Sequence, residues 1–191
     1  MEALKEAIRS RGIGIGDDIV KVDSFLNHKI DVKLSTEMGK AIHEAFKDDK
    51  VDCVLTVEAS GIAVAITTAQ AFGGIPVVFA KKGNHVNVGN DVYAADVYSF
   101  THKQLNSIRV SRSFLPAGTR VLIVDDFLAN GEAIEGLRNI INQAGAVLVG
   151  AAVCVEKGFQ PGGQRLREQG VKVVSLAIVD AIRDGEIVLR D

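Results

Sequence analysis

The chain has 191 residues, with 22 lysines and arginines against 24 aspartates and glutamates, and a formal net charge of −2 at pH 7. This length favours one domain that buries roughly 70% of the surface of its unfolded chain, so neither a disulfide nor a structural metal is needed. The near balance of charge offers no basic field for phosphate backbones, and we expect no nucleic-acid partner.

The amino-terminal segment MEALKEAIRS spaces its apolar residues as an amphipathic surface helix does, which distinguishes it from a targeting signal. Residues 59–80 carry no charge and are long enough to cross a bilayer. A Gly-Gly pair and a proline divide them into a helix, a turn and a strand, so we expect no membrane segment. Cys53 and Cys154 stand in apolar runs, which indicates buried reduced thiols and a cytoplasmic location.

Apolar strand runs alternate with helical stretches from residue 51 onward. In chain order we expect a strand at 51–57, a helix at 59–72, strands at 75–80 and 121–126, a helix at 131–145, and strands at 147–155 and 171–179 separated by QRLREQG (164–170). Continuous apolar strands flanked by helices indicate a parallel sheet covered on both faces, and the fold class is α/β.

Residues 81–119 depart from this rhythm because the chain becomes polar. Alternation over 93–100 predicts a half-exposed strand, and the insertion is interpreted as an antiparallel flap beside the sheet. No repeat or linker indicates a second domain. RGIGIGDD (11–18) lacks a preceding strand and the third glycine of a dinucleotide motif, and is interpreted as a flexible turn. His28, His43, His85 and His102 lack metal-ligand spacing, and no metal site is expected.

The stretch VLIVDDFLANGEA (121–133) places Asp125 and Asp126 where a buried strand meets the carboxyl edge of the sheet, which is where ligands bind in open α/β folds. A loop of small residues follows and leads into a helix whose first N–H groups can hold a phosphate. Two ionised carboxylates accept strong hydrogen bonds from vicinal sugar hydroxyls. Together these features predict a ribose 5-phosphate site, although an Asp-Asp pair can also simply cap a helix and a glycine can serve only a turn.

These residues resemble the phosphoribosyl pyrophosphate (PRPP) signature of type I phosphoribosyltransferases. KVDSFLNH (21–28), DDFLANG (125–131) and EKGFQPG (156–162) resemble, more narrowly, the xanthine phosphoribosyltransferases of bacterial purine salvage. The resemblance covers nearly the whole chain. It implies one domain, 1–191, with a central parallel sheet, a flexible antiparallel flap (82–112) and a small hood from the terminal segments, in which residues 1–35 recognise the base. Homodimers are usual in this family.

The resemblance also implies the parts of the site. Asp125 and Asp126 would hold the ribose and favour positive charge on its ring in the transition state. The PRPP 5′-phosphate would bind the loop formed by Ala129, Asn130, Gly131, Glu132 and Ala133, and the pyrophosphate would bind Ser60 and Gly61 of VEASGIA (57–63), with Lys82 or its neighbour Lys81 neutralising charge. Mg²⁺ would be held mainly by pyrophosphate oxygens. A solvated lysine pair is an equally good interpretation of Lys81 and Lys82.

The common loop of the wider family carries threonines, whereas this one carries Glu132. A carboxylate about 5 Å from a phosphate charge costs about 3 kcal/mol per charge at an effective dielectric of 20, more than the roughly 0.3–1 kcal/mol that a helix N-terminus returns. We therefore expect the Glu132 side chain to point away and to lend only its N–H.

For the base, Lys157 offers only donors, which suits the 6-oxo group of xanthine, hypoxanthine or guanine and not the 6-amino group of adenine. Asn27 is the candidate donor to the second carbonyl of xanthine, and the backbone of Val20 would frame the same edge. Phe159 could pack against the purine face or belong to the core, and we expect it in the core. The alternatives left open are a hypoxanthine-guanine transferase and a PRPP-sensing regulator of the same fold.

Overall fold

The computed structural model describes residues 1–83, 91–99 and 104–191. The parts of the predicted flap within 84–90 and 100–103, which include His85 and His102, lie outside the described residues. The helices are α1 (Glu2–Arg11), α2 (Val32–Ala45), α3 (Gly61–Ala71), α4 (Glu132–Ala144) and α5 (Gly162–Glu168). The strands are β1 (Ile13–Ile15), β2 (Ile19–Lys21), β3 (Cys53–Val57), β4 (Val77–Lys82), β5 (Val92–Ser99), β6 (Gln104–Ser111), β7 (Arg120–Leu128), β8 (Val147–Lys157), β9 (Val173–Arg183) and β10 (Glu186–Leu189).

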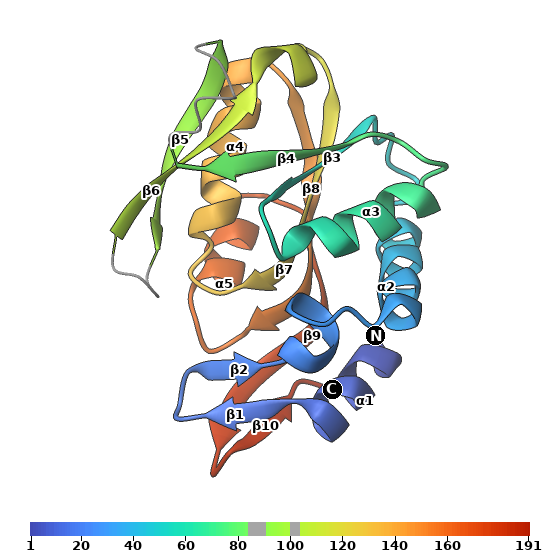
Figure 1. Cartoon of the computed structure of the whole chain (residues 1–191), viewed down its shortest axis with the longest axis vertical. Coiled ribbons are helices and arrows are strands. Elements are labelled where there is room, and N and C mark those ends of the chain that lie inside the picture. Colours follow the sequence, from blue (N-terminus) through green and yellow to red (C-terminus); the bar gives the residue numbers. More distant parts are fainter. Residues whose placement is uncertain (84–90, 100–103) are drawn as a thin grey trace.

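The described strands other than β1 and β2 form one sheet in the order β10-β9-β8-β7-β3-β4-β6-β5 (Figure 1). The five strands from β9 to β4 run parallel, as predicted, while β10, β6 and β5 join antiparallel at the two edges. The sheet as a whole is therefore mixed. The predicted strand at 93–100 is present as β5, with Tyr93 and Ala95 buried and Ala94 and Asp96 exposed.

The two faces of the sheet carry separate apolar clusters because successive side chains of a strand point to opposite sides. Leu122 and Val124 of β7 pack in the cluster that includes α1, α2 and α3, whereas Val121 and Ile123 pack in the cluster that includes α4. Figure 1 shows the same division, with α2 and α3 on one side of the sheet and α4 and α5 on the other. The α/β architecture is confirmed.

A small second layer lies at the carboxyl end of the parallel strands, where α1, β1, β2 and β10 come together with both chain termini (Figure 1). RGIGIGDD is not simply a flexible turn: Ile13–Ile15 forms β1 and pairs antiparallel with Ile19–Lys21. Gly16 turns this hairpin with φ +56°, a left-handed conformation that favours glycine. The uncharged residues 59–80 divide between α3, a turn and β4, and no helix of the described residues has the length and apolarity required to span a membrane.

Candidate active site

Asp125 and Asp126 lie on β7, each 7% exposed. The strand runs two residues beyond them, to Leu128, rather than ending at the pair as predicted. The backbone N–H of Asp126 donates to Asp125 Oδ1 (2.9 Å), and Asn27 Nδ2 donates to Asp126 Oδ2 (3.0 Å). Burial, and next the charge of Asp126, raise the pKa of Asp125 well above its ordinary value of 3.8. The surroundings of Asp125 therefore make its ionisation less favourable than that of a carboxyl group in water.

The small-residue loop leads directly into helix α4, which begins at Glu132 with no side-chain cap on its first N–H groups. Gly131 has φ +85°, which a larger residue would adopt only with strain. The apolar face of α4 packs on the sheet, so the helix start is held firmly while its N–H groups remain free of intrahelical partners. This is the geometry of an anion-binding helix N-terminus.

Glu132, the residue that departs from the common loop, has a cationic partner. Arg165 Nη2 on α5 donates to Glu132 Oε1 (3.1 Å) and to the backbone oxygen of Asn130 (2.9 Å). The contact holds the carboxylate against α5, and the expectation that this side chain turns away from a phosphate stays a prediction.

The residues predicted for pyrophosphate lie where β3 and β4 end. Ser60 immediately precedes α3, and Gly61 is packed so closely on β7 that a Cβ there would lie 2.6 Å from Asp125 Oδ1. Lys82 is the last residue of β4, and its backbone N–H donates to Glu58 Oε1 (2.7 Å). The helix start, the lysine and the acid pair thus approach the same edge of the sheet.

One cavity of about 510 Å³ brings most of these groups together. Its lining includes Ser60, Lys82, both aspartates and the whole loop, with further residues that sequence reasoning did not single out: Val57, Glu58, Val97, Tyr98, Asn106, Phe127, Leu128, Ile108 and Ile134. Gly61 does not line the cavity, but it packs against Asp125, which does. Val20, Asn27 and Lys157 do not line the cavity, and Asn27 reaches it only through its hydrogen bond to Asp126.

The predicted base-recognition residues lie beside the cavity, at the junction of β8 with the amino-terminal hairpin. Lys157 Nζ donates to the backbone oxygen of Asp18 (2.6 Å), and Gln160 Nε2 donates to the Asp18 carboxylate. Val20 is buried at 7% exposure. Phe159 is 37% exposed, so its predicted core position is wrong: it lies in the turn after β8, where no layer covers it.

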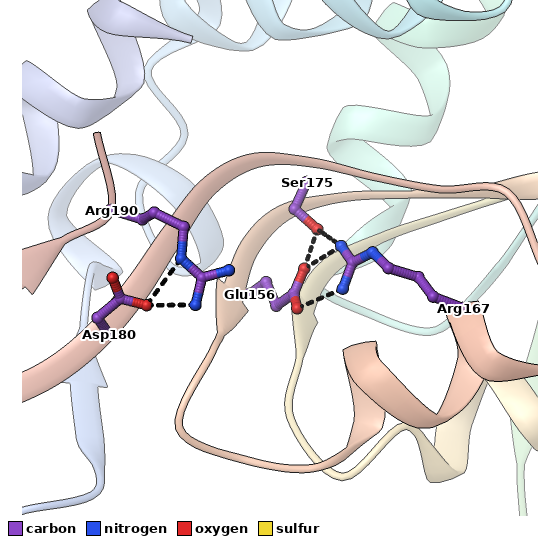
Figure 2. A network of polar contacts seen from close by, with 5 residues as sticks. All are labelled: Glu156, Arg167, Ser175, Asp180 and Arg190. Carbon is purple, nitrogen blue, oxygen red and sulfur yellow. Dashed lines mark hydrogen bonds and ion pairs between the residues drawn. The ribbon is translucent and has the colours of Figure 1, made fainter.

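Next to Lys157, polar side chains from β8, α5, β9 and the carboxyl-terminal segment form a network of contacts (Figure 2). Glu156 is 3% exposed and accepts from Arg167 Nη1 (2.8 Å) and Nη2 (2.6 Å) and from the Ser175 hydroxyl. Arg190 near the carboxyl terminus donates through Nε to Asp180 Oδ1 (3.0 Å). A Cβ at Gly158 would lie 3.0 Å from Arg190 Nη2, so this second pair abuts the turn that follows Lys157.

Comparison with known proteins assigns the family. The model of the phosphoribosyl transferase domain matches residues 21–185. The chain belongs to the phosphoribosyltransferase family. It is 50% identical over 191 residues to a protein of Alkaliphilus metalliredigens named xanthine phosphoribosyltransferase, covering all of this chain and 94% of that one. It is likewise 50% identical over 190 residues to the xanthine phosphoribosyltransferase of Clostridioides difficile, covering both chains fully.

Solved structures agree on the phosphoribosyltransferase fold. Adenine phosphoribosyltransferase from Trypanosoma brucei superposes with a TM-score of 0.75 at 16% identity, covering 92% of this chain and 78% of that one. The adenine phosphoribosyltransferase from Rhodothermus marinus gives a TM-score of 0.73 at 23% identity, covering 93% and 97%. At these identities the likeness concerns the fold alone.

Several residues near the site of this phosphoribosyltransferase carry no local sequence signal. Tyr98 and Asn106 belong to the strands of the flap and reach the cavity only because β6 pairs with β4. Asp18 and Arg165 contact residues 139 and 33 positions away in the chain, respectively. Only the folded chain brings such residues to the site.

Proposed function

We propose that the protein transfers the phosphoribosyl group of PRPP to xanthine, giving xanthosine 5′-monophosphate and pyrophosphate. The observation that carries the proposal is the 510 Å³ cavity in which an acid pair, an uncapped helix start and a lysine face one space. The names of relatives about 50% identical over the whole chain support the same reaction.

In this proposal three groups of residues at the cavity bind the three parts of PRPP. The backbone N–H groups of the loop 129–133 bind the 5′-phosphate, and Asp125 and Asp126 accept hydrogen bonds from the ribose hydroxyls. Ser60 and Gly61 at the start of α3, with Lys82, bind the pyrophosphate. These assignments are supported by the lining of the cavity and by the approach of Gly61 to Asp125.

The transfer forms a bond between a ring nitrogen of the base and the anomeric carbon, and breaks the bond from that carbon to pyrophosphate oxygen. The bonding electron pair leaves with pyrophosphate, the proton of the ring nitrogen is released to water, and positive charge develops on the ribose ring. Two carboxylates beside the ring stabilise that charge. Hydroxyl donors from the ribose would favour the ionised form of Asp125 and so oppose the burial and the neighbouring charge that raise its pKa.

Mg²⁺ fits this donor set as a cation carried by the substrate. Within the described residues, no group of three or more His, Cys, Asp or Glu side chains is placed to hold a metal. Mg²⁺ prefers oxygen ligands and often binds substrate phosphates rather than an all-protein cage. When bound, it would supply charge neutralisation for the departing pyrophosphate.

Specificity for the base is assigned to Lys157, Asn27 and the backbone of Val20. An ammonium group has three donors, and Lys157 directs two of them at the backbone oxygen (2.6 Å) and the Oδ1 (3.5 Å) of Asp18, which leaves one for a 6-oxo group. The Asn27 amide has two N–H donors and one is directed at Asp126, which leaves one for the 2-oxo group of xanthine. The exposed Phe159 is available to pack on the purine face.

We also place the protein in the cytoplasm as a homodimer that binds neither nucleic acid nor membrane. Two buried free cysteines support a reducing compartment, and the near-neutral charge supports small-molecule substrates.

The experiment that tests the proposal incubates the purified protein with PRPP, Mg²⁺ and one purine at a time, and records pyrophosphate release. Fastest turnover with xanthine is expected. Better turnover with hypoxanthine or guanine would instead support the alternative of a hypoxanthine-guanine phosphoribosyltransferase. No turnover with any purine would favour a PRPP-sensing regulator.

A further inference from the structure

Helix α5 begins in direct backbone contact with the loop 129–133, which is proposed to bind the 5′-phosphate and is called the phosphate loop below. The N–H of Gly162 donates to the backbone oxygen of Ala129 (3.1 Å). A Cβ at Gly162 would lie 2.3 Å from that oxygen and 2.6 Å from the nitrogen of Gly131, so no larger residue fits without moving the loop. The loop is therefore built against α5 as well as on the start of α4.

Arg165, one turn into α5, holds the next peptide unit. Its Nη2 donates to the backbone oxygen of Asn130 (2.9 Å), so two successive carbonyls of the loop are anchored on α5. A trans peptide unit is planar, and its C=O and N–H point in opposite directions. Anchoring the oxygens of Ala129 and Asn130 thus directs the N–H groups of Asn130 and Gly131 away from α5.

The same guanidinium offsets an unfavourable charge. Among the described residues, four acids line the cavity, namely Glu58, Asp125, Asp126 and Glu132, against a single lysine, Lys82. Such a lining repels a substrate that carries phosphate and pyrophosphate unless part of its charge is offset. Arg165 Nη2 lies 3.1 Å from Glu132 Oε1, the acid within the phosphate loop itself.

We propose that Arg165 is a positioning residue for PRPP, which aims the N–H groups of the loop and neutralises Glu132 beside the 5′-phosphate. The inference rests on the proposed function, since it presumes that the loop binds the phosphate of PRPP. It explains how this chain uses a glutamate at a position where the resembled family commonly has a hydroxyl residue: the charge is tolerated because α5 supplies its partner.

The test compares Arg165→Met with Arg138→Met, in the parent chain and in a Glu132→Gln background. Arg138 is the matched control because it pairs with Glu135 on α4 (2.9 Å) without lining the 510 Å³ cavity. Calorimetric titration with PRPP and Mg²⁺ gives the Kd, and steady-state kinetics give separate KM values for PRPP and xanthine. Thermal unfolding monitors the fold of each variant.

Arg165→Met is expected to raise the Kd and KM for PRPP about tenfold or more, since it exposes the phosphate to an unpaired carboxylate. The KM for xanthine at saturating PRPP should change by less than about threefold, because the base does not touch this loop. In the Glu132→Gln background the loss should shrink by at least about threefold, and in both backgrounds it should weaken as salt rises from about 50 to about 300 mM. Arg165→Lys should recover most of the affinity, and Arg138→Met should bind PRPP as the parent does.

Unchanged PRPP affinity in Arg165→Met, equal losses for PRPP and xanthine, or an undiminished loss in the Glu132→Gln background would each overturn the proposal. If Arg165→Met does not fold, Arg165→Gln, which keeps a donor without charge, takes its place with the same expectations. Failure of the parent to use any purine would refute the proposed function instead. The titration with PRPP needs no base and still decides the role of Arg165.

Discussion

The buried carboxylate of Glu156 gives a direct test of how the end of β8, where Lys157 lies, is supported. Its side chain is 4% exposed and is held by both terminal nitrogens of Arg167 at 2.6 and 2.8 Å (Figure 2). Arg167→Met would leave this carboxylate with the Ser175 hydroxyl as its remaining partner in the network. A buried charge without a counter-charge is strongly unfavourable.

The size of the effect follows from the burial of the pair. Removing one partner of a fully buried pair costs about 3–5 kcal/mol. Arg167 is 37% exposed, and solvent screening reduces the expected loss of unfolding free energy to about 2 kcal/mol. For a domain of this length that corresponds to a melting temperature lower by about 4–8 °C.

The loss should also depend on pH in a defined direction. Burial acts to raise the pKa of Glu156, but hydrogen bonds from Arg167 and Ser175 outweigh it and hold that pKa below its ordinary value of 4.5. The ion pair therefore contributes stability above the ordinary pKa and loses it as pH falls through the lowered one. In Arg167→Met the buried carboxyl accepts a proton more readily, so the deficit should be largest near pH 7.5 and shrink toward about pH 5.

Thermal and urea unfolding of the parent and of Arg167→Met at about pH 7.5 and about pH 5 measure both effects. Arg9→Met is the control, since Arg9 forms an ion pair with the exposed Glu2, and its melting temperature should match the parent's. A deficit below about 0.5 kcal/mol, or one that grows as the pH is lowered, would refute the reasoning.

Four further variants and one control probe the cavity and the base side. Lys157→Ala should raise the KM for xanthine far more than the KM for PRPP, and equal increases would contradict its assignment. Asn27→Leu should reduce the use of xanthine more than that of hypoxanthine in the purine assay, and an unchanged ratio would argue against amide recognition. Gly61→Ala places a Cβ 2.6 Å from Asp125 Oδ1 and should abolish transfer, whereas Gly39→Ala, equally crowded but between α2 and α3, should lower the melting temperature with kcat retained. Asp125→Asn should lose transfer yet unfold at a higher temperature than the parent at pH 7. Burial and a neighbouring carboxylate raise the pKa of Asp125, so its ionisation destabilises the fold as pH rises above 3.8; a gain that persists unchanged at low pH would contradict this.

The sequence predicted those parts of the molecule whose information is local. The run from Val121 to Ala133 contains its own strand, acids, left-handed glycine and helix start, and the structure reproduces that order, with the strand one residue longer at its start and two at its end. Alternation likewise located β5 in the flap. Periodicity and turn chemistry act over a few residues, so one sequence suffices to find them.

What the sequence did not predict depends on partners distant in the chain. RGIGIGDD forms β1 because Ile19–Lys21 lies opposite it, and so pairing overrides the loop-like composition. Phe159 is exposed because the turn after β8 is covered by no other layer, which its hydrophobicity cannot reveal. Arg165 donates a hydrogen bond to Glu132 only because α5 packs on the loop 129–133. Such contacts are set by tertiary packing and have no signature in local pattern.

One cavity is proposed to hold the phosphate and the ribose of PRPP in adjacent places. A crystal structure with PRPP bound would show directly whether it does. The account predicts the 5′-phosphate within about 2.7–3.2 Å of N–H groups in the loop 129–133, with the ribose hydroxyls on Asp125 and Asp126. A ribose bound elsewhere, or acids that make no contact with it, would contradict the account.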